Sequence, residues 1–185
     1  MRWPIVLALT VGIATSACGS GTGPSGSGTL RMMIKDSPFQ DAKALLVTFS
    51  EVDLHKSDTP DGSWTKLIGV ERTCDLKRLE TSVDALGTGT LTSGHYTQIR
   101  FVVTKAVVYF DNPTVEANGC AVAVPLGRNA DVTIPSGEIK LNREFEVPNG
   151  GATTVTIDFD GEHSVHLTGS GQYMMSPVIS IVSVQ

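Results

Sequence analysis

The chain has 185 residues, of which 41% are hydrophobic and 18% are charged, and its formal net charge is −5. This length and composition are those of one globular domain and exclude a disordered chain. A mildly acidic chain with scattered lysines lacks the basic surface that nucleic acid requires and the basic patch that anionic lipid headgroups require. We therefore expect no nucleic-acid partner, and any attachment to a membrane must be covalent.

Residues 1–17 have the features of an export signal. Arg2 precedes an apolar run over residues 5–14, which is too short for a span because a bilayer core needs about 20 residues of helix. Thr15-Ser-Ala-Cys18 follows, and it resembles the cleavage motif of bacterial lipoproteins, whose cysteine thiol accepts a lipid. We predict that residues 1–17 are removed and that Cys18 carries the lipid anchor. Leucine is usual where Thr15 stands, so cleavage as an ordinary secretory peptide is the alternative.

A tether follows the predicted cleavage site. Residues 18–28 are rich in glycine and serine and have no side chains able to build a core, so we predict a flexible segment. Residues 29–185 then form a single domain held at the cell envelope through the lipid. Gly19 stands where an aspartate commonly retains lipoproteins in an inner membrane. In a host with two membranes, this favours the outer membrane.

From residue 29 onward, apolar and polar residues alternate in successive short runs. The runs lie at residues 30–35, 44–55, 99–109, 139–147 and 154–160. Alternation places one side of each run in a core and the other in water, which is typical of half-buried antiparallel strands. Turn-forming residues separate the runs, so the pattern predicts an all-β, antiparallel β-sandwich.

Two segments depart from simple alternation. Within residues 44–55 the apolar positions change from odd to even numbers near Ser50 and Glu51, and a bulge there would keep one face buried. Between residues 76 and 86, leucine and valine recur at helical spacing. This second pattern predicts one short helix or an irregular crossover.

Two cysteines remain once Cys18 carries lipid, namely Cys74 and Cys120. An exported domain with an even number of thiols is expected to pair them, since the envelope of many bacteria is oxidising. We predict a disulfide that closes a loop of about 46 residues and stabilises the fold by on the order of 4 kcal/mol. Free buried thiols are the alternative. Two cysteines with scattered histidines offer too few ligands for zinc.

Seven stretches of the chain, in order through nearly all of residues 28–182, carry a family resemblance. They are Gly28–Pro38, Val47–His55, Trp64, Gly94–Val103, Ser136–Leu141, Thr154–Asp160 and Pro177-Val-Ile179. Together they resemble a family of bacterial lipoproteins known as domain of unknown function 4382. The resemblance implies a prealbumin-like, carbohydrate-binding-type β-sandwich. It implies no enzymatic site and no mechanism.

The carboxylates of Asp158, Asp160 and Glu162 are the strongest candidate for a metal site. Asp158 and Asp160 share one strand face, about 6.6 Å apart, and calcium prefers several carboxylate oxygens. The cluster lacks the remaining ligands of an EF-hand loop, so we interpret it as a solvated strand face that runs into a turn. We therefore predict no bound metal. A glycosidase pair would need a substrate cleft that the sequence does not locate.

Arg100 and Trp64 are weak candidates for ligand binding. Arg100 lies opposite the apolar stripe of its strand, where it can contact a ligand carboxylate or pair with a cross-strand Asp or Glu, and we favour the pairing. Trp64 is the only tryptophan left after removal of residues 1–17. This scarcity of aromatic side chains argues against a strong lectin.

The sequence assembles no catalytic set. It has no Gly-x-Ser-x-Gly motif, no histidine pair at metal-ligand spacing and no lysine following the glycine-rich residues 87–94. We therefore predict a protein that is not an enzyme and needs no cofactor. The first hypothesis is a lipid-anchored module that binds a ligand such as carbohydrate. The second is a structural lipoprotein that assembles with another envelope protein. The third is a hydrolase, for which the sequence offers no catalytic residues.

Overall fold

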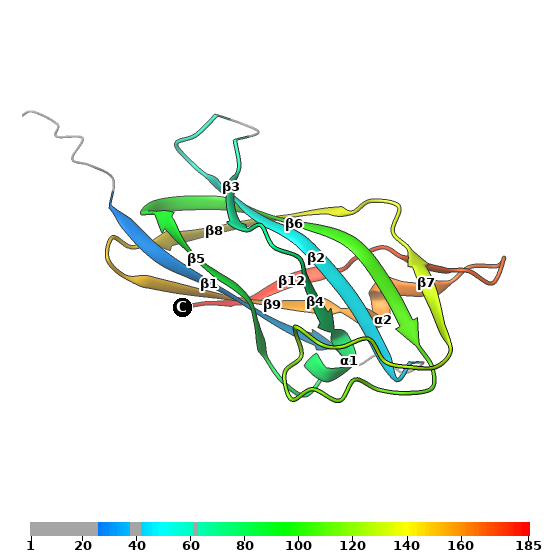
Figure 1. Cartoon of the computed structure of the whole chain (residues 1–185). Helices are drawn as coiled ribbons and strands as arrows, with labels where there is room; N and C mark the ends of the chain where they lie inside the picture. The colour runs from blue at the N-terminus through cyan, green and yellow to red at the C-terminus, as the bar shows by residue number, and fades with distance from the viewer. Residues whose placement is uncertain (1–25, 38–41, 61–62) are drawn as a thin grey trace, which may run out of the picture.

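The structure is a computed structural model that describes residues 26–37, 42–60 and 63–185. The predicted signal segment 1–17 and Cys18 lie outside the described residues. Two β-sheets and two short helices make up the described fold (Figure 1). The elements are β1 (Ser27–Ser37), β2 (Ala44–Lys56), β3 (Thr65–Ile68), β4 (Arg72–Asp75), α1 (Leu76–Leu79), β5 (Asp84–Thr92), β6 (Gly94–Tyr109), β7 (Asn129–Thr133), β8 (Glu138–Val147), β9 (Ala152–Asp160), α2 (Gly161–Ser164), β10 (Val165–Leu167), β11 (Tyr173–Met175) and β12 (Ile179–Val184).

The two sheets form the predicted all-β sandwich. The smaller sheet has the strand order β12-β9-β1-β5. In the larger sheet, β10-β11-β7-β6-β2-β3 form one path, β4 pairs with β2, and β8 pairs with β6. Most pairings are antiparallel, as expected, but β1–β9 and β11–β7 are parallel. The partners of each parallel pair are far apart in the chain, so no hairpin turn sets their relative direction.

The core lies between the sheets and is built from the alternating apolar residues. On β1, Leu30, Met32 and Ile34 are fully buried. Across the core, the ring of Phe49 on β2 meets the ring of Phe159 on β9 edge to face, with 6.1 Å between centroids. Because the side-chain period of a strand is two, the alternation is sufficient to build both inner faces.

The predicted bulge in β2 is confirmed. The register of β2 against β6 shifts on both sides of Phe49. Thr104 of β6 is the unpaired residue at the first shift and Ser50 of β2 at the second, and pairing resumes with Glu51. The buried side chains before and after the bulge are Leu45, Val47, Phe49, Val52 and Leu54. The unpaired Ser50 therefore keeps the apolar side chains of both halves of the strand in one core.

The domain begins earlier than predicted. β1 starts at Ser27, so Ser27 and Gly28, which we assigned to the tether, belong to the sandwich. Gly28 packs so tightly that a Cβ atom there would lie 2.3 Å from the carbonyl oxygen of Pro148. The glycine that looks like tether composition is thus required by a close approach of two backbones.

The segment 76–86 is helical only over α1. The side chain of Asp75 caps this single turn by accepting a hydrogen bond from the Lys77 backbone N–H. Leu76 and Leu79 are buried, whereas Val83 is exposed, and Leu86 is buried as part of β5. The helical spacing in the sequence therefore combines one helical turn with the start of a strand.

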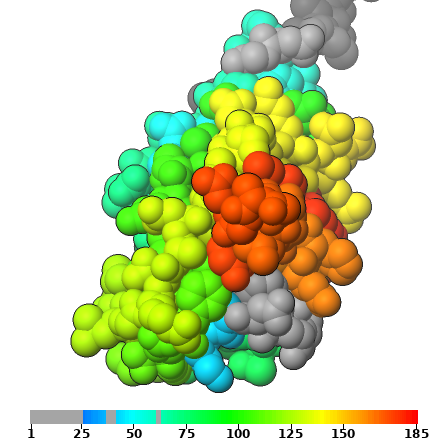
Figure 2. Space-filling model, turned by 90° about the vertical axis from the view of Figure 1, so that its right-hand side faces the viewer, coloured from blue at the N-terminus to red at the C-terminus, as the bar shows by residue number. Residues whose placement is uncertain are grey.

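The sandwich has two distinct ends. Where the described chain begins, the Ser93 backbone N–H donates to the carbonyl of Gly26 and that of Gly150 donates to Ser27, both at 2.8 Å. β6 runs from this end to the opposite end at Tyr109, and its 16 residues span roughly 50 Å (Figure 1). We call these the proximal and distal ends. Figure 2 views the distal side, where the yellow-green segment 110–128 stands at the lower left.

Candidate functional site

The outer face of the larger sheet brings the two ligand candidates together. Polar side chains alternate there with the core residues of β2, β6 and β8, so that Asp53 lies opposite Arg100 and Arg100 lies opposite Lys140. Trp64, just before β3, lies over this part of the face. We define the Trp64 patch as Trp64, His55, Asp53, Arg100 and Lys140.

Trp64 is held by three of these neighbours. The guanidinium carbon of Arg100 is 4.7 Å from the centroid of the indole ring, and the Lys140 Nζ atom is 5.7 Å from it. The ring of His55 meets the indole edge to face at 5.7 Å. Cations at this distance are attracted to the negative face of an indole. Trp64 is therefore a half-buried ring with a defined position on the sheet.

Arg100 makes the cross-strand pair that we favoured from the sequence. Its Nε and Nη2 atoms donate to Oδ2 of Asp53 at 3.1 and 2.7 Å, and its Nη1 atom lies 3.7 Å from Glu138. Asp53 is only 1% exposed. A buried carboxylate with two charge-assisted contacts fixes the plane of the guanidinium. Asp53 thus positions Arg100, and Arg100 in turn positions Trp64.

The predicted disulfide between Cys74 and Cys120 is present, with an S–S distance of 2.03 Å. The two cysteines face each other in an antiparallel bridge, between the hydrogen bonds Asp75 N–H to Gly119 and Ala121 N–H to Thr73. Their Cα atoms are 3.9 Å apart, below the usual range of about 4.4–6.8 Å, because directly opposed residues of a ladder approach closely. The bond fastens the segment 113–125 to β4.

This fastened segment packs against an apolar part of the outer face at the distal end. Here Ala44, Leu46, Val107 and Tyr109 form a second, smaller buried cluster, and Val122 packs against it. The sequence carried a signal for this cover, because residues 44–47 and 106–109 are apolar without alternation. Continuous apolar runs are typical of strands that are buried on both faces. We did not predict a cover over this face from the sequence.

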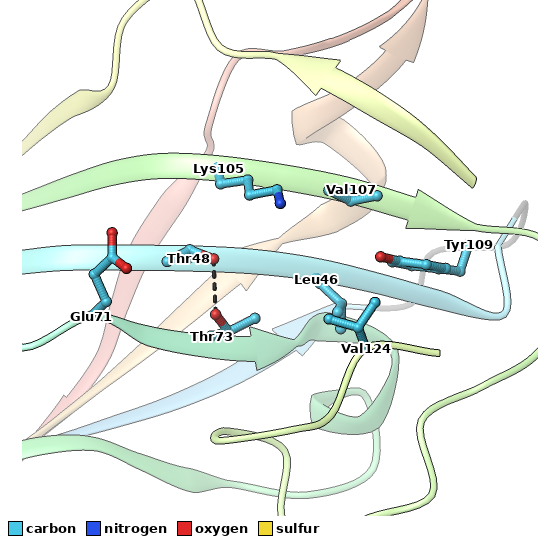
Figure 3. A pocket seen from close by; sticks show the side chains of 8 residues that line it. All are labelled: Leu46, Thr48, Glu71, Thr73, Lys105, Val107, Tyr109 and Val124. Atoms are coloured by element: carbon cyan, nitrogen blue, oxygen red, sulfur yellow. Dashed lines mark hydrogen bonds between the residues drawn. The ribbon is translucent and has the colours of Figure 1, made fainter. Parts of the chain in front are cut away.

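A pocket of about 260 Å³ lies beside this cluster and opens on the outer face (Figure 3). Leu46, Val107 and Tyr109, each 5% exposed, line it together with Val124 of the fastened segment. On its polar side, the hydroxyls of Thr48 and Thr73 lie 2.9 Å apart, and Lys105 and Glu71 complete the lining. We call this the distal pocket. None of the eight residues that line it is a candidate site residue from the sequence.

The acidic candidates for a metal site are engaged with the protein itself. Asp158 forms an ion pair with Lys35 of the neighbouring strand at 2.7 Å. Asp160 caps α2 by accepting a hydrogen bond from the His163 backbone N–H. Burial raises the pKa of Asp160, but hydrogen bonds from the His163 backbone and ring outweigh it and hold the pKa below the usual value. Glu162 is exposed on α2. In the described part of the chain, no three His, Cys, Asp or Glu residues are grouped to hold a metal ion.

The fold and the outer face define the class: an all-β sandwich with an aromatic, charged patch and a separate pocket on one sheet. The chain matches the family described as Domain of unknown function (DUF4382) over residues 27–177, and it belongs to that family. The resemblance seen in the sequence is thus confirmed. No curated protein and no solved structure matches the chain. No helix among the residues that the structure describes is long and apolar enough to cross a membrane.

Proposed function

We propose that this chain is a lipid-anchored protein of the cell envelope that binds carbohydrate without catalysing a reaction. The Trp64 patch is its binding surface. One observation carries the proposal: an indole ring on a sheet face is held in position by Arg100, Lys140 and His55. Sugars present apolar C–H faces that pack on aromatic rings, and a rigid ring loses little conformational freedom on binding.

The surroundings of the indole supply the polar contacts that a sugar needs. Arg100 and Lys140 offer charged donors within the patch, and the exposed carboxylate of Glu138, 3.7 Å from Arg100, is a charged acceptor beside it. Next to them, the amide of Gln98 on β6 donates to the amide oxygen of Asn142 on β8 at 3.1 Å. Hydrogen bonds that involve an ionised group are about twice as strong as neutral ones, so they are suited to fixing sugar hydroxyls.

A glycan array tests the binding. The purified full-length chain in detergent should bind a subset of the glycans, and Trp64→Ala should weaken that binding about tenfold because the stacking surface is lost. Trp64→Phe keeps an aromatic ring and should retain most of the affinity, which makes it the matched control. An array without signal, or a Trp64→Ala variant that binds as well as the natural chain, would contradict the proposal.

Anchoring is tested separately at Cys18. The described chain enters the sandwich at the proximal end, so a lipid on Cys18 would place that end toward the membrane and the distal end away from it. We expect Cys18→Ser to release the protein from the membrane fraction or to stall its processing. Unchanged fractionation together with a mature N-terminus that carries no lipid mass would rule out the anchor.

A second function, docking to another envelope protein, is favoured by the fastened segment at the distal end and by Leu126, which directly follows it. Val115, Val124 and Leu126 are 86%, 68% and 83% exposed there. Exposed apolar side chains that cluster on one segment are typical of protein interaction sites. Cross-linking in the envelope followed by co-purification should then recover a partner that is lost with Leu126→Asp and kept with Trp64→Ala.

A further inference from the structure

We infer that the distal pocket is a second ligand site and that it takes one N-acetylated amino sugar. The inference rests on the proposed carbohydrate-binding function, but it assigns a site that shares no residue with the Trp64 patch. At about 260 Å³ the pocket is close to the smallest ligand sites of proteins, which begin near 300 Å³. It therefore suits one sugar ring or its substituent rather than a chain of sugars.

The hydroxyl of Tyr109 is the observation that points to a ligand. Two tyrosines of β6 are buried, and the first, Tyr96, is 1% exposed and donates its hydroxyl proton to the carbonyl of Thr92 at 2.8 Å. Tyr109 is 5% exposed, and its hydroxyl is directed into the pocket (Figure 3). No described residue forms a hydrogen bond with it. The Tyr109 hydroxyl is not among the buried unpaired atoms of the described residues, so it is reached from the pocket and can donate to an acceptor there.

The other polar groups of the pocket are also available. Neither Lys105 nor Glu71 forms an ion pair within the described residues, and both are exposed at the rim. The hydroxyls of Thr48 and Thr73 bond to each other, and each oxygen keeps a free lone pair. One positive and one negative group at the same rim favour a neutral ligand, since a charged ligand would meet a like charge on one side.

An acetamido group matches this arrangement of surfaces. Its methyl group fits the apolar floor formed by Leu46 and Val107, and its carbonyl oxygen accepts a hydrogen bond from the hydroxyl of Tyr109. Its N–H and the ring hydroxyls have acceptors and donors at the rim in Glu71 and Lys105. A sugar without the acetamido group would leave the apolar floor of Leu46 and Val107 without its methyl contact, which weakens binding.

The test measures binding of N-acetylglucosamine and of glucose to the full-length chain by calorimetry or ligand-observed NMR. We expect saturable binding of N-acetylglucosamine. Glucose should bind at least about tenfold more weakly, because it lacks the acetamido group that the pocket recognises. Tyr109→Phe removes only the hydroxyl and should raise Kd about fivefold, the effect of one neutral hydrogen bond. Val124→Trp should fill the pocket and abolish binding. Tyr173→Phe, on β11, is the matched control and should bind normally with an unchanged melting temperature.

The outcomes separate this inference from the proposed function. Equal binding of both sugars, no binding of N-acetylglucosamine, or full binding by Val124→Trp would overturn the pocket assignment. If Trp64→Ala abolishes binding of the single sugar while Val124→Trp retains it, the Trp64 patch is the site and the pocket is not. If the array is silent but Val124→Trp removes a measured affinity for N-acetylglucosamine, the pocket assignment holds and the Trp64 proposal fails.

Discussion

The proximal and distal halves of the outer face of the larger sheet differ in chemistry, although the same strands form both. Around Trp64 the outward side chains are charged and paired across strands, as in Asp53 with Arg100. Around Tyr109 they are apolar, and the disulfide-bonded segment packs beside them. β2 and β6 run through both halves, so the backbone does not create the difference. The outward side chains, and the segment that packs on them, decide whether that part of the sheet face is exposed to solvent or is buried in a second, smaller core.

Removal of the disulfide should have the largest effect, and it should fall on the distal half. The double variant Cys74→Ala with Cys120→Ala should lose about 4 kcal/mol of unfolding free energy, because the unfolded chain regains the freedom of a 46-residue loop. Urea unfolding measures this loss. Hydrogen exchange should rise in the segment 113–125 and remain low in β6 and β8 near Trp64. A uniform rise over both halves would show that the two are one cooperative unit.

Asp75, at the end of β4, should be the next most sensitive residue of the distal half. Its buried carboxylate accepts hydrogen bonds from Leu45 N–H at 3.0 Å, Lys77 N–H at 3.1 Å and the Thr114 hydroxyl at 2.6 Å. Asp75→Ala leaves these donors without an acceptor and should destabilise the fold by about 3 kcal/mol. Asp75→Asn keeps an acceptor oxygen and the same shape, so it should destabilise much less. Equal losses in both variants would contradict the role of the acceptors.

The same residue predicts a pH dependence. Burial raises the pKa of Asp75 above its usual value, although the hydrogen bonds from Thr114, Leu45 and Lys77 act in the opposite direction. Between the unfolded and the folded pKa the folded state binds more protons, so the contribution of Asp75 to stability falls as pH rises through that window and is constant above it. Melting temperatures across this window should show the slope in the natural chain, and Asp75→Asn should remove it.

On the proximal half the corresponding effect should be smaller. Asp53→Asn removes the charge that holds Arg100, and the Arg100 side chain is 20% exposed, so water screens part of the loss, which we expect to be about 1–2 kcal/mol. The fluorescence of Trp64 should change because Arg100 no longer fixes the ring. As a control, Lys66→Gln breaks an exposed pair with Glu51 and should leave the unfolding free energy nearly unchanged. Unaltered fluorescence in Asp53→Asn would separate Trp64 from the Asp53–Arg100 pair.

Much of the fold could be predicted because it depends on local patterns. The alternation in β1 and β9 and the phase change at Ser50 each involve neighbouring residues, and the structure has them as expected. The pairing of Cys74 with Cys120 followed from the number of thiols once Cys18 was set aside as the predicted lipid site. The prediction was wrong at the start of β1, where Gly28 has the composition of a tether but packs against Pro148 in the turn between β8 and β9.

The candidate sites could be predicted only in part, because each combines residues from several strands. Arg100 and Trp64 were separate weak candidates in the sequence, and the register of β2, β6 and β8 makes them one patch. Tyr109 was only one of three tyrosines, and its sequence neighbours do not show that its hydroxyl has no partner among the described residues while that of Tyr96 has one. Tyr96 lies in the core between the sheets and reaches the carbonyl of Thr92, whereas Tyr109 belongs to the smaller cluster on the outer face.

By itself the sequence determined the fold class, the buried faces of the strands, the disulfide and the family, because these depend on periodicity, on thiol number and on residues read in chain order. Only the tertiary structure decided where the outer face is charged and where it forms a pocket. The physical reason is that strand register places residues from distant parts of the chain within contact distance. A disulfide between β4 and a long connecting segment then selects the half of the sheet against which that segment packs.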